Sequence, residues 1–159
     1  MDELLHLKTI FTGDYTVTER PNPVPGDLRI AWGQSLLLLV LASSRSQKCS
    51  LQKMHFLAHL SRTAGSRQQA RDVLARVIEP NALSVRVEPW VNRAVAFAKA
   101  TGLVTVAGGN SVGLTEAGRL AAAALRKAGV SVEEAEFLDQ VGKITTEKVV
   151  EHIMKMEDF

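Results

Sequence analysis

The segment FAKATGLVTVAGGNSVGLTEAGRLAAAA, residues 97–124, decides the fold. Its first part has a helical apolar pattern that ends at Gly102, and glycine closes helices well because it adopts a left-handed conformation without steric cost. Short apolar segments then lie on either side of Gly108-Gly109-Asn110, a turn composition typical of β-hairpins. Thr115 is placed to cap a further helix, which we expect to run to Gly129. The segment therefore predicts a helix, a small hairpin and a second helix in succession.

The chain before this segment is predicted to be helical, with one short strand. A crowded apolar pattern from residue 28 to residue 43 predicts a central helix that is buried on nearly every side. Gly65 is expected to end one helix, and Ser66 with Gln69 matches the capping box that opens the next. The expected elements are helices at 28–43, 50–63, 66–77 and 89–102, and a half-buried strand at 83–87.

The two ends of the chain are predicted to extend beyond this middle part. Residues 1–27 form an expected extended N-terminal arm, because three prolines between positions 21 and 25 forbid a helix there. Residues 130–159 form an expected acidic helical extension, in which Ser131 and Glu134 match a capping box. The arm carries large apolar side chains that we expect to bind a partner chain, namely Leu4, Leu5, Ile10 and Phe11.

Composition places the chain among soluble globular proteins. Of its 159 residues 46% are hydrophobic and 23% are charged, as in an ordinary globular domain. The longest apolar run, residues 36–42, is far shorter than the ~20 residues of a membrane-spanning helix, and the first residues lack the basic start of a signal peptide. The single cysteine, Cys49, excludes an internal disulfide and a cysteine-built zinc site. We therefore expect a cytoplasmic protein with no membrane partner.

Charge is distributed unevenly along the chain, although the net charge is only +2. Counting Asp and Glu against Lys and Arg gives net charges of −2 for residues 1–44, +6 for 45–78, +3 for 79–132 and −5 for 133–159. The basic block at 45–78 indicates an anionic partner. An equally simple interpretation is that these side chains form solvated helix faces balanced by the acidic C-terminal extension.

Residues 97–124 resemble the closing half of a winged helix-turn-helix domain, with the hairpin as the wing and Leu-Thr-Glu-x-Gly-Arg opening the last helix. This resemblance implies a mainly α fold with a small β wing (α+β), covering residues 28–129. Two further stretches, ERPNPVPGDLRIAW at 19–32 and EPWVNRAVAFAKATGLV at 88–104, are similar to the small middle subunits of bacterial ABC-three-component defence systems, the Lamassu type among them. That similarity implies an adaptor that assembles with an SMC-like or ABC-type ATPase subunit and an effector subunit in anti-phage or anti-plasmid defence.

No pattern in the chain predicts catalysis, a cofactor or a metal site. His55 and His59 have a metal-compatible spacing, but Phe56 stands where the zinc-protease pattern needs Glu. Gly108-Gly109 lacks the Lys-Ser/Thr of a phosphate-binding loop. Cys49 has no assignable His partner, so a structural thiol is expected.

A winged-helix domain that reads DNA needs Arg, Lys, Asn or Gln on its reading helix and wing. The predicted wing tip, residues 106–112, has no basic side chain. The helix at 89–102 offers only Asn92, Arg93 and Lys99, so the basic helix at 66–77 is the better candidate. The side chains expected to contact nucleic acid or an acidic partner are Arg62, Arg67, Gln68, Arg71 and Arg76. The alternative is that these arginines pair with acids of the C-terminal extension or of a partner chain. The sequence thus favours a non-catalytic adaptor that binds partner proteins, with contact to the DNA backbone, without sequence preference, left open. The alternative is a winged-helix transcriptional regulator.

Overall fold

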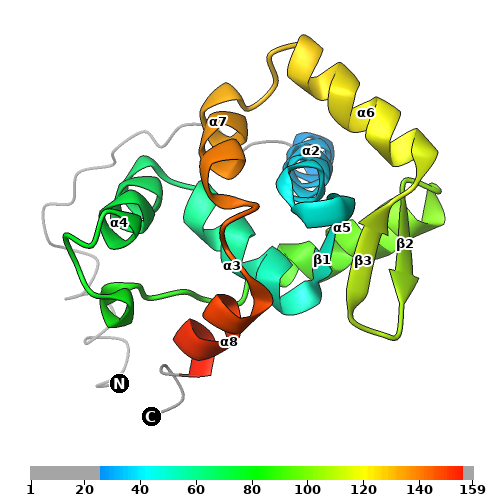
Figure 1. Cartoon of the computed structure of the whole chain (residues 1–159). Helices are drawn as coiled ribbons and strands as arrows, with labels where there is room; N and C mark the ends of the chain where they lie inside the picture. The colour runs from blue at the N-terminus through cyan, green and yellow to red at the C-terminus, as the bar shows by residue number, and fades with distance from the viewer. Residues whose placement is uncertain (1–25, 156–159) are drawn as a thin grey trace, which may run out of the picture.

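In the computed structural model, described over residues 26–155, the protein is mainly α-helical with one small antiparallel sheet (Figure 1). The coarser part of the expected fold class, α+β with little β, is therefore confirmed. The N-terminal arm, including Leu4, Leu5, Ile10 and Phe11, lies outside the described residues. The α-helices are α2 (Gly26–Ser43), α3 (Leu51–Ser61), α4 (Ala64–Leu74), α5 (Pro89–Ala100), α6 (Glu116–Lys127), α7 (Val132–Val141) and α8 (Glu147–Lys155).

Helix α2 is the centre of the core, as its apolar composition predicts. Its residues 36–41 are all at most 3% exposed, because α3, α5, α6, α7 and the sheet surround it. A stretch buried on every side has no polar face, which explains why all of residues 36–41 are apolar. The prediction of a buried helix over 28–43 is wrong near its start, where residues 29–31 are exposed. Figure 1 shows α6 and α7 beside α2, with α4 and the sheet at opposite ends of the molecule.

The sheet has three antiparallel strands in the order β1-β3-β2, formed by β1 (Lys48–Ser50), β2 (Val104–Ala107) and β3 (Ser111–Leu114). The predicted hairpin is confirmed: β2 pairs with β3, and Gly108 and Gly109 both have positive φ. The third strand is not the predicted one. Residues 83–88 form no strand, and β1 instead pairs Cys49 with Val112. Burial does alternate from Leu83 to Arg86, but Val87 is 58% exposed. Strand pairing depends on which segment reaches β3.

Two helix starts also differ from the prediction. Helix α4 begins at Ala64 because the Thr63 hydroxyl accepts the Ser66 N–H at 3.1 Å, so Gly65 lies inside the helix. The predicted capping box at Ser66 is therefore wrong. The second predicted box is also wrong, because Ser131 is left-handed (φ 49°) and makes no side-chain cap, while Glu134 turns toward Arg67.

The junction between hairpin and α6 is tightly built. The Thr115 hydroxyl accepts the Gly118 N–H at 3.0 Å and lies 2.7 Å from the Gly102 carbonyl oxygen, which confirms Thr115 as the cap. A Cβ atom on Gly118 would lie 2.0 Å from the Leu103 carbonyl oxygen. Gly118 is thus required by the close approach of α6 to the backbone that enters the hairpin.

The acidic C-terminal helices pack back on the core. Helix α7 contacts α2 and α3, and α8 contacts α3. Their buried side chains include Phe137, Leu138, Val150 and Ile153. Over residues 26–155, none of the helices combines the length and apolarity needed to cross a bilayer.

Candidate binding surfaces

A groove of about 610 Å³ lies between the first half of α2 and the outer face of α5. It is called the α2–α5 groove below and is lined by Arg29, Ile30, Gly33, Gln34, Trp90, Arg93, Ala94 and Phe97. Ile30 and Phe97 are 54% and 50% exposed, so large apolar surface meets water on both helices. Gly33 shapes the groove, because a Cβ atom there would lie 3.2 Å from the Trp90 ring.

A polar side chain is fixed in the wall of this groove. The Gln34 Nε2 donates to the Ala94 carbonyl oxygen at 2.8 Å, and because that carbonyl only accepts, the orientation of the amide is determined. Gln34 is 8% exposed, and its Oε1 is buried with no hydrogen-bond partner among the described residues. A buried acceptor without a donor is uncommon and unfavourable.

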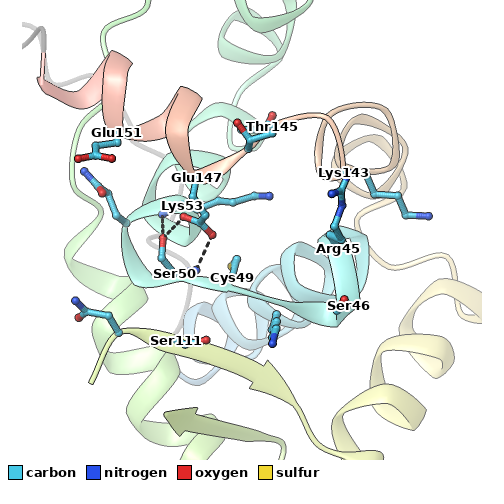
Figure 2. A pocket seen from close by; sticks show the side chains of 14 residues that line it. Arg45, Ser46, Cys49, Ser50, Lys53, Ser111, Lys143, Thr145, Glu147 and Glu151 are labelled. Atoms are coloured by element: carbon cyan, nitrogen blue, oxygen red, sulfur yellow. Dashed lines mark hydrogen bonds between the residues drawn. The ribbon is translucent and has the colours of Figure 1, made fainter. Parts of the chain in front are cut away.

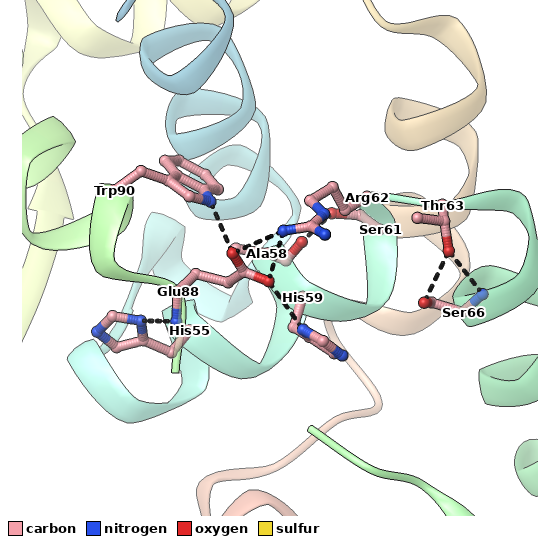
Figure 3. A network of polar contacts seen from close by, with 9 residues as sticks. All are labelled: His55, Ala58, His59, Ser61, Arg62, Thr63, Ser66, Glu88 and Trp90. Atoms are coloured by element: carbon pink, nitrogen blue, oxygen red, sulfur yellow. Dashed lines mark hydrogen bonds and ion pairs between the residues drawn. The ribbon is translucent and has the colours of Figure 1, made fainter. Parts of the chain in front are cut away.

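A buried carboxylate joins α3 to the start of α5 (Figure 3). Glu88 is 5% exposed, and its carboxylate accepts hydrogen bonds from Arg62 at 3.0 and 3.1 Å and from the Trp90 indole N–H at 3.1 Å. The His59 Nδ1 lies 2.8 Å from the same carboxylate. These contacts hold Trp90 in position against Gly33 and thereby stabilise one end of the α2–α5 groove.

His55 is locked into one neutral tautomer beside this carboxylate. The Glu88 backbone N–H donates to His55 Nδ1 at 3.2 Å, so Nδ1 carries no proton and Nε2 is the atom that faces Asn92 Oδ1 at 3.3 Å. Burial lowers the pKa of His55 below its usual 6.5, because the charged ring loses solvation, although Asn92 and Glu88 oppose this effect. His55 and His59 thus both have hydrogen-bond partners within the fold.

We expect the free energy of unfolding to decrease as the pH falls from 7.5 toward 5. Because the pKa of His55 is lower in the folded chain, the unfolded chain takes up the proton first. The contribution of neutral His55 is fully present above pH 6.5 and is lost progressively below it. Urea unfolding at several pH values measures this, and H55N should show a smaller decrease over the same range. A variant with the same pH dependence as the wild type would contradict the assignment.

The structure distributes the predicted basic residues over different environments. Arg67 is buried, donates to the Ser61 carbonyl oxygen at 2.8 Å and pairs with Glu133 of α7. Arg71 donates to Gln140 at 3.1 Å, and its guanidinium lies over the Phe137 ring. For these two arginines the geometry matches the alternative interpretation, in which the basic block contacts the C-terminal extension.

The other members of that set lie nearer to solvent. The Arg62 side chain is 49% exposed although it pairs with Glu88, and Gln68 donates to Asp72 at 2.8 Å. Arg76 is exposed just after α4, with a positive φ of 58°. Contact of Arg62, Gln68 and Arg76 with DNA or with an acidic partner remains a prediction.

A second pocket, of about 650 Å³, lies where β1, the N-terminus of α3, the hairpin tip and the α7–α8 connection meet (Figure 2). Its exposed cations are Arg45, Lys48 and Lys143, and we call it the cationic pocket. Glu147 lies within it and accepts hydrogen bonds from the Ser50 N–H at 3.0 Å and the Ser50 hydroxyl at 2.5 Å. Sequence reasoning missed this pocket, because its residues come together only when β1 joins the sheet.

The single cysteine, Cys49, is buried in the fold. Burial raises the pKa of the Cys49 thiol to about 12, so little thiolate forms at neutral pH. Within residues 26–155, no cluster of three His, Cys, Asp or Glu side chains is arranged to hold a metal ion.

No family model, curated protein or solved structure matches the chain. Because no relative indicates a function, the function has to be inferred from the surface of the described residues. The relevant surface features are the α2–α5 groove, the cationic pocket and the exposed face of α5. Of these, the groove combines exposed large apolar side chains with a concave shape.

Proposed function

We propose that the chain is a non-catalytic winged-helix adaptor that binds a partner protein through the α2–α5 groove. The order of elements supports the winged-helix part of this proposal: α2, β1, α3 and α5 precede the β2–β3 hairpin, and β3 lies between β1 and β2. In this interpretation α4 is an additional helix before α5, the hairpin is the wing, and α7 and α8 are appended helices.

The composition of the outward face of α5 is the observation that carries the proposal. A helix that reads bases presents several Arg, Lys, Asn or Gln side chains to the major groove. The exposed face of α5 includes Asn92, Arg93 and Lys99, but it also presents the apolar side chains of Ala96, Phe97 and Ala100. The hairpin tip has no basic residue. Half-exposed aromatic side chains beside a concave surface are typical of protein interfaces.

The proposed partners follow from the sequence resemblance. They are an SMC-like or ABC-type ATPase subunit and an effector subunit of a defence complex in the bacterial cytoplasm. Exposed basic side chains such as Arg62 and Arg76 are available for additional contact with DNA phosphates or with acidic partner surfaces. Such contacts strengthen binding without reading sequence.

The second candidate function, a DNA-binding transcriptional regulator, is favoured by the cationic pocket. Arg45, Lys48 and Lys143 line the same pocket as the hairpin tip residue Asn110, and a wing that binds DNA contacts phosphates with such cations. Glu147 counteracts this charge, because its carboxylate occupies the position in front of the α3 N-terminus.

Selection of a random duplex library on the full chain separates the two functions. We expect weak binding that falls steeply with salt and a preference among sequences of less than ~10-fold, because few side chains face base edges. K48E with K143E is expected to reduce this residual binding. K127E on α6 serves as the control, since Lys127 is exposed but does not line the pocket. One enriched motif with nanomolar affinity at physiological salt would overturn the adaptor in favour of the regulator.

A further inference from the structure

The α2–α5 groove carries an uncompensated positive charge. Arg29 and Arg93 line it from α2 and α5, and no carboxylate is among its lining residues. Neither arginine makes an ion pair with a described residue, in contrast to Arg62, Arg67, Arg119 and Arg126. The groove therefore combines an apolar surface with two cations that make no ion pair with the side chains described over residues 29–155.

The wall of the groove also lacks one hydrogen bond. The Gln34 Oε1 is buried without a donor, and the bond from Nε2 to Ala94 prevents the amide from turning to exchange the two ends. Because this oxygen is buried and the amide is held in place, it is a fixed polar point inside the groove wall, beside the apolar side chains of Ile30 and Phe97.

We propose that the occupant of the groove is an acidic, apolar peptide segment of a partner protein. Its large apolar side chains cover Ile30, Trp90 and Phe97, and its carboxylates pair with Arg29 and Arg93. Charge complementarity favours an acidic segment over a basic one, and the apolar surface between the arginines favours a peptide over the nucleic-acid backbone. This inference rests on the proposed function and specifies its ligand.

Selection of displayed random dodecapeptides on the immobilised full chain tests the inference. We expect enriched peptides that combine at least two large apolar side chains with at least one Asp or Glu. A synthetic consensus peptide should lose ~10-fold or more of its affinity on R93E, as for a desolvated charge pair, and a similar amount on F97E. L120E on α6 is the matched control, since Leu120 is 65% exposed but does not line the groove, and it should bind as the wild type does.

A charge exchange makes the test specific. Replacing the peptide acid by Lys should restore binding to R93E while weakening binding to the wild type. Peptides that depend on Phe97 but contain no acid and bind R93E normally would overturn the acidic ligand and leave the proposed adaptor intact. Enriched peptides that bind F97E as well as the wild type, or no enrichment at all, would overturn the groove as their site. Concentration-dependent dimerisation that F97E abolishes would instead identify a second copy of the chain as the occupant and would also overturn the inference.

Discussion

Substitution of Gly118 by Ala is expected to lower the free energy of unfolding by about 3 kcal/mol or more, among the largest effects of any single methyl group in this chain. The added Cβ would lie 2.0 Å from the Leu103 carbonyl oxygen and 3.1 Å from Leu114 Cδ2. The carbonyl oxygen cannot move away, because it already accepts the Thr115 N–H at 3.0 Å. Relief of the clash would separate α6 from the hairpin and lose the Thr115 cap.

Thermal and urea unfolding of G118A measure this effect. For a chain of this size, 3 kcal/mol corresponds to a fall in Tm of roughly 6–12 °C. The matched control is G65A in α4, where the nearest atom to the new Cβ is 4.0 Å away and a gain of up to ~1 kcal/mol is expected from helix propensity. Equal stabilities of G118A and the wild type would show that α6 does not approach the hairpin this closely.

The second large effect is expected on binding rather than on stability. Phe97 is 50% exposed, so F97E should change the free energy of unfolding by only about 0.5 kcal/mol, as for most surface substitutions. A partner that covers this ring would meet a charge in a desolvated contact. Loss of a central aromatic contact costs about 2 kcal/mol or more, which is a ~30-fold weaker complex.

Local signals in the sequence were sufficient for the elements around the hairpin. Gly102, Gly108 and Gly109 have the positive φ values that their positions predict, and Thr115 caps α6. Each of these features depends on a few neighbouring residues, and the same is true of the apolar pattern that marks α2 as the central helix. The requirement for Gly118 could not be predicted in this way, because it arises from the Leu103 carbonyl oxygen on the other side of the hairpin.

Features that depend on distant residues could not be predicted. Residues 48 and 49 lie between the helices predicted at 28–43 and 50–63, and the sequence pattern predicts that Ser50 begins the second of them. The three residues form a strand only because β3 presents Val112 opposite Cys49. In the sequence Arg67 looks like one more surface charge of the basic block. In the structure it is buried and pairs with Glu133, which is far away along the chain. The α2–α5 groove is likewise formed by side chains about sixty positions apart, with Gln34 bonded to the Ala94 carbonyl.

Affinity purification of the tagged full chain from its native host, in wild-type, F97E and L120E forms, tests protein binding through the α2–α5 groove most directly. We expect the wild type and L120E to retain the same partner proteins in similar yield, an SMC-like or ABC-type ATPase subunit among them, and F97E to lose them while remaining folded. Retention of those partners by F97E at wild-type yield would contradict the groove as the binding surface.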